Sequence, residues 1–278
     1  MEIRTYHSKD ELELPLIVYK YRDWNNNHHK TIISKNELYF ASPRDFEDPK
    51  DCKNLIDYSL LTDDQIYNKY YTNAAKDHPE WSETERHNCV KYWVKKGLLR
   101  NEVLIKSTIE EYNNIFFDCF GVLSTAIEYE SLEMWNKYAN NKTGFCIGLS
   151  TRDLVNTIEN IAGGYIDYCE ELPLIHPFEN HLALYIKQIH SKEIKWKFEK
   201  EYRLRVRHES KMSLKERVIN FNPDSIKYLI FGAKMKLKIR REIKKLATIK
   251  FKNIRFIQMV EIRALPIKSP PQYFYVEL

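Results

Sequence analysis

Two carboxylates stand two residues apart in the stretch WKFEKEYRLRV, which covers residues 196–206. If this stretch is an extended strand, Glu199, Glu201 and Arg203 share one face, because successive side chains alternate across a strand. Two acids on one face can converge on a cleft and carry chemistry. They can equally form a salt-bridged strand edge with cations such as Lys197 and Arg203. The sequence leaves both interpretations open.

Two aromatic residues, Trp135 and Tyr138, lie one turn apart in SLEMWNKYANN, residues 131–141. The apolar spacing of this segment predicts a helix, and Ser131 is typical of the residue that begins one. An aromatic pair of this kind can wall a pocket by stacking on a nicotinamide or a nucleobase. It can also pack the helix onto a sheet.

The strongest charge feature is the segment KMKLKIRREIKKL, residues 234–246. Its leucines and isoleucines recur at roughly helical spacing, which predicts an apolar inner face and a cationic outer face. The outer face is either simply solvated or binds RNA or DNA phosphates, in which case binding would weaken steeply with salt. The candidate nucleic-acid contacts are Lys238, Arg240, Arg241, Lys244 and Lys245.

Metal-ligating patterns are weak. The five cysteines are far apart and form no Cys-x-x-Cys pair, which is typical of reduced thiols. The adjacent His28 and His29 are predicted to lie in a solvated loop. The acid-x-Lys triplet at residues 193–195, with Asp167 before it, leaves a metal-dependent nuclease as an alternative. However, the segment between Asp167 and the triplet looks helical, where such nucleases place adjacent strands. We predict no metal cofactor.

The elements that must position these residues follow from hydrophobic periodicity. The run Leu14 to Tyr21 predicts a strand with Arg22 at its end, and DCFGVLSTAI predicts a buried strand that carries Ser124 and Thr125. Strands without regular βαβ alternation favour an α+β fold. Further strands are predicted at residues 37–41, 143–150, 164–168, 201–206, 217–221, 226–231, 254–262 and 273–277, further helices at 151–161, 178–194 and 233–247, and a helical insertion at 57–116.

Composition bounds the class of protein. A chain of 278 residues with 43% hydrophobic residues is predicted to form a single domain over residues 1–278, with the insertion inside it. The excess of 44 Lys and Arg over 39 Asp and Glu gives a formal charge of +5, which allows a nucleic-acid partner without demanding one. The 7 glycines form no Rossmann or P-loop motif.

The first 15 residues carry acids where a signal peptide needs a basic start and an apolar run. No later apolar segment approaches the length that spans a membrane. We therefore expect a soluble, cytoplasmic protein with no membrane partner. The sequence does not determine its oligomeric state.

The order of short motifs resembles a bacterial family best known as a domain of unknown function. One departure is Glu47, where that family more often has Asn. The resemblance spans most of the chain and implies no activity by itself. It rests on YKYR at residues 19–22, SP at 42–43 with FEDP at 46–49, MWNKYA at 134–139, GFCIG at 144–148 and WKFEKEYR at 196–203.

A second resemblance is to the arginine-first class of ADP-ribosyltransferases. These enzymes use an Arg at the end of an early strand, a Ser-Thr-Ser segment on a middle strand and a Glu-x-Glu before a late strand. The chain has Arg22, then Ser124-Thr125-Ala126, then Glu199-Lys200-Glu201, in that order. Ala126 departs from the pattern. The resemblance implies a mixed or antiparallel sheet core of ADP-ribosyltransferase type and NAD as the substrate.

The same resemblance implies roles for particular residues. A carboxylate that bonds the ribose 2′-hydroxyl supports the oxocarbenium character that grows as nicotinamide leaves, and an arginine fork can hold a diphosphate. The implied catalytic residues are Glu201 and its acceptor-activating neighbour Glu199. The implied NAD-binding residues are Arg22 on the early strand, with Tyr21 before it, and Ser124 and Thr125 at the nicotinamide ribose. The candidate stacking surfaces are Trp135 and Tyr138, because of their aromatic spacing.

The leading hypothesis is therefore an NAD-consuming enzyme of the ADP-ribosyltransferase or NAD glycohydrolase type. By analogy of fold, it would act as a bacterial toxin or phage-defence effector that modifies protein or nucleic acid. The metal-dependent nuclease is one alternative. The other is a non-enzymatic module that recognises nucleic acid or a phage protein through the cationic helix or the aromatic cleft.

Overall fold

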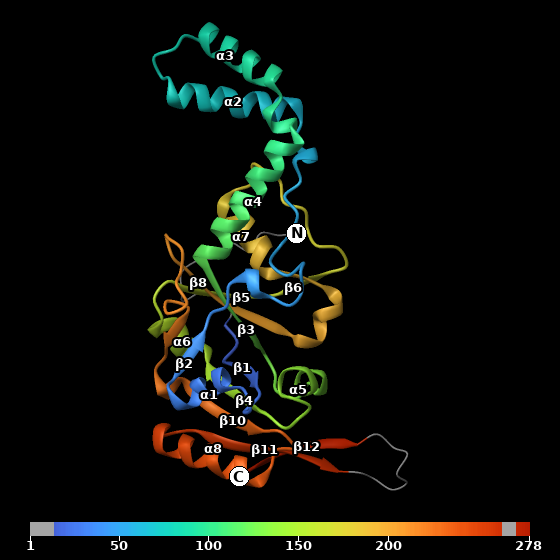
Figure 1. Cartoon of the computed structure of the whole chain (residues 1–278), viewed down its shortest axis with the longest axis vertical. Helices are drawn as coiled ribbons and strands as arrows, with labels where there is room; N and C mark the ends of the chain where they lie inside the picture. Colours follow the sequence, from blue (N-terminus) through green and yellow to red (C-terminus); the bar gives the residue numbers. More distant parts are fainter. Residues whose placement is uncertain (1–13, 263–270) are drawn as a thin grey trace.

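A computed structural model describes residues 14–262 and 271–278 of the chain (Figure 1). The expectation that the first residues are not a signal peptide concerns mainly residues 1–13, which lie outside the described residues. The body of the molecule is built on one large mixed sheet, and a helical arm extends from it along the longest axis. The predicted α+β class is confirmed.

The large sheet has eight strands in the order β12-β11-β10-β4-β1-β3-β8-β5. All of its neighbouring pairs are antiparallel except β10 and β11, which are parallel. The predicted strands agree with its members to within a few residues. Their bounds are β1 Ile17–Arg22, β3 Phe120–Ala126, β4 Phe145–Ser150, β5 Ile161–Tyr165, β8 Glu201–Arg207, β10 Ile226–Phe231, β11 Arg255–Ile262 and β12 Gln272–Glu277.

The sheet opens between two of its central strands. Strand β1 pairs with β4 through six residue pairs, and β3 pairs with β8 through seven. Between β1 and β3 the described ladder has one pair, Tyr19 with Ala126. The rest of β1, including Lys20 and Arg22, therefore diverges from β3 and leaves a gap in the middle of the sheet.

Helices cover both faces of the sheet. On one face, α1, α6 and α8 pack through residues such as Ile33, Leu154 and Ile243 onto Leu149 and Leu229. On the other face, the short helix α5 packs onto the alternate residues of the same strands. The bounds of these helices are α1 Asn27–Ser34, α5 Leu132–Tyr138, α6 Thr151–Thr157 and α8 Leu237–Lys250.

Helix α1 corrects the sequence analysis, which placed His28 and His29 in a loop. The side chain of Asn26 accepts a hydrogen bond from the His28 backbone N–H and begins the helix. Ile32 and Ile33, in the last turn of this helix, are buried. An N-cap followed by two apolar residues at the buried face is enough to fold this polar segment when the body supplies a surface to pack on.

The segment predicted as a helical insertion contains three α-helices, which form an arm. Helices α2 and α3 form a hairpin at the far end of the molecule, and α4 connects it to the body (Figure 1). Both α2 and α3 begin with a capping box, and Gly97 ends α3 in the left-handed conformation. The bounds are α2 Asp63–Asp77, α3 Glu83–Lys96 and α4 Glu102–Cys119.

The segment before β8 differs from its predicted long helix. Helix α7 is shorter than residues 178–194, and the residues that follow it form a strand, β7, parallel to β6. A 3₁₀ helix, η4, then leads to Lys200, whose φ of 41° is in the left-handed region. The remaining bounds are α7 His181–His190, β6 Asp167–Cys169, β7 Ser191–Glu193, η4 Ile194–Glu199, β2 Glu37–Tyr39 and β9 Val218–Asn220.

Candidate active site

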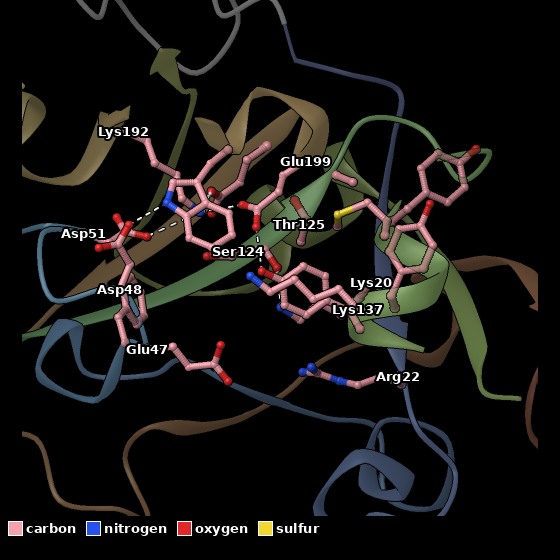
Figure 2. Close-up of a pocket in the computed structure, with 18 of the residues that line it drawn as sticks. Lys20, Arg22, Glu47, Asp48, Asp51, Ser124, Thr125, Lys137, Lys192 and Glu199 are labelled. Atoms are coloured by element: carbon pink, nitrogen blue, oxygen red, sulfur yellow. Dashed lines mark hydrogen bonds and ion pairs between the residues drawn. The ribbon is translucent and has the colours of Figure 1, made fainter. Parts of the chain in front are cut away.

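A pocket of about 260 Å³ opens where β1 and β3 diverge (Figure 2). Strand β1 supplies one wall and β3 the floor. The segment Asp45 to Asp51, helix α5 and the η4 region supply the rest. The pocket is therefore assembled from five segments that lie far apart in the sequence.

Seven of the eight residues proposed for catalysis or NAD binding line this pocket. They are Tyr21, Arg22, Ser124, Thr125, Tyr138, Glu199 and Glu201.

The eighth, Trp135, is fully buried instead. Its indole N–H donates to the Tyr129 carbonyl at 2.7 Å, and its ring packs edge-on against Tyr21. Of the two roles that the sequence left open for Trp135, the structure supports packing of α5 onto the sheet. Tyr138, one turn later, is at the pocket.

The two glutamates do converge, but not through strand alternation as predicted. Glu199 ends η4 and Glu201 begins β8, with the left-handed Lys200 between them. Both carboxylates accept from the Lys192 ammonium, Glu199 at 2.5 Å and Glu201 at 3.0 Å. The Tyr138 hydroxyl donates to the other oxygen of Glu199 at 2.5 Å.

Arg203 ties Glu201 into a larger buried network. Its guanidinium donates to both Glu201 oxygens, at 2.7 and 3.1 Å, and to Asp51 at 2.7 Å. Asp51 also lies 3.4 Å from the Lys192 ammonium. None of the side chains of these residues is more than 8% exposed. Glu201 therefore does form salt bridges, but they are buried in the pocket wall and not at a solvated strand edge.

The network keeps Glu201 and Lys192 ionised. Burial by itself would raise the pKa of the Glu201 carboxyl, but Arg203 and Lys192 outweigh it and hold that pKa well below the usual range. Burial would likewise lower the pKa of Lys192, and Glu201 and Asp51 raise it above the usual range instead. Three carboxylates against two cations leave one net negative charge on this side of the pocket.

The opposite wall is cationic. Lys20 and Arg22 project from the same face of β1, and the Lys20 amine donates to the Ser124 carbonyl across the gap in the sheet. Burial lowers the pKa of Lys20 to about 7 and that of Arg22 to about 10. In Figure 2, the Arg22 guanidinium points across open space toward Glu47. No ion pair of Arg22 is present among residues 14–262 and 271–278.

An aromatic side chain stands at the rim. The indole N–H of Trp196 donates to the Asp48 carboxylate at 2.5 Å. The Lys137 ammonium lies 3.7 Å from the centre of the Trp196 ring. Asp48 also accepts from the Lys50 backbone N–H at 3.0 Å.

Sequence reasoning missed several residues of the site. Lys20 and Trp196 stood within quoted motifs but were given no role. Asp51 and Lys192 had no distinguishing signal, since an isolated acid and an isolated lysine are common in any chain. Thr125 was expected at a ribose, yet its hydroxyl donates to the Tyr202 carbonyl at 2.5 Å.

The proposed nucleic-acid residues lie away from the pocket. They are all on α8, which packs on the face of the sheet opposite α5. Arg240 donates to Gln258 at 2.6 Å, and the Lys244 ammonium lies 4.9 Å from the centre of the Phe256 ring. Arg240 and Lys244 therefore contact strand β11 and are partly buried, whereas Lys238, Arg241 and Lys245 are exposed.

The residues of the nuclease alternative, Asp167, Glu193 and Lys195, do not form a metal site in the described part of the chain. The objection that the segment between Asp167 and Glu193 looks helical was right for α7 but wrong for the residues after it, because β7 ends at Glu193 and pairs in parallel with β6, which carries Asp167. Glu193 forms ion pairs with Lys50, at 2.7 Å, and with Lys195. Within the described residues, no group of three or more His, Cys, Asp or Glu side chains is arranged to hold a metal ion.

Residues 134–263 match the family described as "Protein of unknown function (DUF2971)". The match covers slightly less than half of the chain and includes α5, β8 and α8, so the resemblance to a family of unknown function is confirmed over this segment. No curated protein and no solved structure matches the chain. Over the part of the chain that the structure describes, no helix has both the length and the apolarity to cross a bilayer.

Proposed function

We propose that the protein is an NAD-consuming enzyme of the ADP-ribosyltransferase or NAD glycohydrolase type, built on a sheet of that type. The supporting observation is that Arg22, Ser124 and the Glu199–Glu201 pair meet at one pocket, although they are far apart in the chain. Their strands β1, β3 and β8 are consecutive in the sheet. A common site for the three motifs is what NAD binding of this type requires.

The charge distribution of the pocket fits NAD. One wall has a net negative charge, because the three carboxylates of Asp51, Glu199 and Glu201 are paired with the two cations Lys192 and Arg203. The other wall presents the Arg22 guanidinium. The oxidised cofactor is itself dipolar, with a cationic nicotinamide ring and an anionic diphosphate. The acidic wall would face the ring and its ribose, and the Arg22 fork would face the diphosphate.

The acidic wall would also favour bond cleavage. As nicotinamide leaves, positive charge moves to the ribose, and carboxylates fixed beforehand stabilise it without reorganisation. Glu201 is held ionised by Arg203 and Lys192, which already occupy both of its oxygens. Glu199 accepts one hydrogen bond on each oxygen and retains lone pairs for a sugar hydroxyl or an incoming acceptor.

The size of the pocket limits what it encloses. A volume of about 260 Å³ is slightly below the range of typical small-molecule sites, which are about 300–1,000 Å³. It would hold the nicotinamide and its ribose, and the adenosine half would lie outside, toward Arg22. Tyr138 and the rim residue Trp196 offer aromatic surfaces to the ring.

NAD turnover tests the proposal. Purified protein with labelled NAD, alone and with bacterial lysate or nucleic acid, is expected to release nicotinamide or transfer label. Glu201→Gln is expected to reduce turnover at least about hundredfold, as loss of a group that stabilises transition-state charge does. Glu159→Gln, an exposed acid far from the pocket, is the matched control and should be unchanged.

A second variant, Arg22→Gln, distinguishes loss of NAD binding from loss of folding. Glu201→Gln also disturbs Arg203, so its folding must be checked by circular dichroism and thermal unfolding. Arg22→Gln removes no ion pair recorded in residues 14–262 and 271–278, and should leave stability intact while weakening NAD binding by about 10- to 100-fold. Unchanged affinity in this variant, or no NAD binding by the parent protein, would overturn the proposal. If turnover depletes cellular NAD, a toxin or phage-defence role would follow.

A further inference from the structure

The Lys20 amine is a second chemical group in the pocket, and the proposed NAD chemistry does not use it. Lys20 lies on β1 where that strand diverges from β3, and its side chain lines the pocket. Its hydrogen bond is to a backbone carbonyl, that of Ser124, rather than to a carboxylate. A neutral amine that donates one N–H to this carbonyl still has its lone pair free for the cavity.

The surroundings of Lys20 favour that neutral form. The largest effect is burial in the pocket wall, and Arg22 on the same strand adds to it. The negative charges of Glu201 and Glu199 across the pocket raise the pKa of Lys20, whereas the positive charge of Lys192 beside them lowers it. The net result is a pKa of about 7 for Lys20. A substantial fraction of the amine is therefore unprotonated at neutral pH.

The other two lysines of the pocket differ in this respect. Lys192 is within 3.4 Å of three carboxylates, which hold its pKa above the usual range. Lys137 is exposed at the rim. Of the three, Lys20 alone combines enclosure with the absence of an acidic partner in the described residues, which are the conditions that activate a lysine as a nucleophile.

Arg22 determines which ligand would approach Lys20. Its guanidinium is half-buried, points into the pocket and has no recorded carboxylate partner in the described ranges. Removing a guanidinium from water without an anion is unfavourable, so the position is suited to a phosphate. Lys20 and Arg22 are two residues apart on one strand face, within reach of one small molecule.

We propose that Lys20 forms a Schiff base with the aldehyde carbon of a phosphorylated sugar whose phosphate is held by Arg22. The amine nitrogen attacks the carbonyl carbon to give a carbinolamine, which loses its hydroxyl as water and leaves a carbon–nitrogen double bond. The reaction consumes no oxidant or reductant. This site stands whether or not the protein cleaves NAD. Its ligand would be the open-chain ribose of ADP-ribose or a free sugar phosphate.

Reductive trapping tests the site. The full-length protein is treated with pyridoxal 5′-phosphate, an aldehyde that carries a phosphate, then reduced with borohydride and mapped by peptide mass spectrometry. Label is expected on Lys20 ahead of the surface lysines, with half-maximal labelling near pH 7. Lys20→Arg should lose this label, and Arg22→Gln should reduce its rate at least about tenfold. Lys137→Arg is the matched control and should retain it.

Two further arms identify the ligand. ADP-ribose and ribose 5-phosphate are each incubated with the protein and cyanoborohydride, and the adduct mass on Lys20 is measured. An adduct with ADP-ribose at lower concentration assigns the first source, and an adduct with ribose 5-phosphate assigns the second. Labelling of Lys20 no faster than exposed lysines, or equal labelling in Arg22→Gln, would overturn the proposal. A positive result without NAD turnover would refute the proposed function alone.

Discussion

Lys192 is the residue on which the acidic wall depends. Its ammonium contacts Glu199, Glu201 and Asp51, which come from two separate segments of the chain. Carboxylates this close would otherwise share protons, because two negative charges at short range disfavour full ionisation. Lys192 therefore acts on the proposed reaction through Glu199 and Glu201, as a positioning residue.

Replacement of Lys192 should change the pH dependence as well as the rate. In Lys192→Met, the acid limb of the NAD-turnover profile is expected to move up by about one to two pH units, because one glutamate retains a proton. Lys192→Arg, which keeps the charge, should leave the limb near its original position. A uniform loss of rate with an unchanged profile in Lys192→Met would indicate a purely structural role.

The same variant has a consequence for stability. The folded-state pKa of Glu201 lies below its ordinary value of 4.5, so its ion pairs contribute stability above pH 4.5 and lose it as the pH falls further. Removal of one partner of a buried ion pair costs about 3–5 kcal/mol. Lys192→Met should therefore unfold at lower denaturant concentration at pH 7, and the difference from the parent should narrow toward pH 3.

At the level of elements, the site depends on breaks in regular structure. The pocket exists because β1 leaves β3 after a single described pair, and the two glutamates converge because η4 and a left-handed Lys200 precede β8. An uninterrupted sheet would have closed the gap. The helical arm, by contrast, contributes no residue to the pocket.

The arm should therefore be removable. The guanidinium of Arg100 donates to the Leu61 carbonyl at 2.7 Å, so the two ends of the α2–α3 hairpin are adjacent. Replacement of residues 62–99 by a short Gly-Ser linker is expected to leave NAD affinity within about twofold, as for a distant independent site. Calorimetric titration and thermal unfolding measure this. Loss of binding in a folded variant would show that the arm takes part in the site.

The exposed surface of the arm makes it a candidate for recognition instead. Tyr92 on α3 is 54% exposed, and α3 packs mainly on α2. Val103, at the start of α4, is 78% exposed. Within the described hairpin, the buried core includes Ile66, Ala74 and Val90. Such a small core agrees with an element whose function lies in its surface rather than in stabilising the body.

At the level of the whole molecule, the sheet separates two surfaces. The pocket opens beside α5, and α8 covers the opposite face with its exposed cations outward. A nucleic acid bound along α8 would not lie at the pocket. If nucleic acid is the acceptor of ADP-ribose, it must be bound elsewhere.

This separation predicts independent effects. Lys238→Glu, Arg241→Glu and Lys245→Glu together should leave NAD affinity within about twofold, because they lie on the far face. The same triple change should weaken any RNA binding, most strongly at low salt. A triple Lys→Glu change at Lys91, Lys95 and Lys96 on the arm gives the same charge change as a control. A large effect of the α8 variant on NAD affinity would contradict the separation.

The sequence by itself determined the local structure and much of the site. Hydrophobic periodicity predicted the α+β class and most strands and helices. The ordered Arg, Ser-Thr and Glu motifs predicted five residues that line the pocket, and Tyr21 and Tyr138 were predicted beside them. Periodicity was sufficient because each strand or helix carries its own pattern of buried and exposed positions.

Only the tertiary structure decided the partners of those residues. Asp51 meets Arg203 across 152 positions of sequence, and Lys192 meets both glutamates. The tertiary structure also decided that Trp135 packs in the core, that His28 and His29 lie in a helix and that Lys20 faces a cavity. An ion pair or a cavity depends on where distant backbones approach in space, and no local pattern of residue types records that approach.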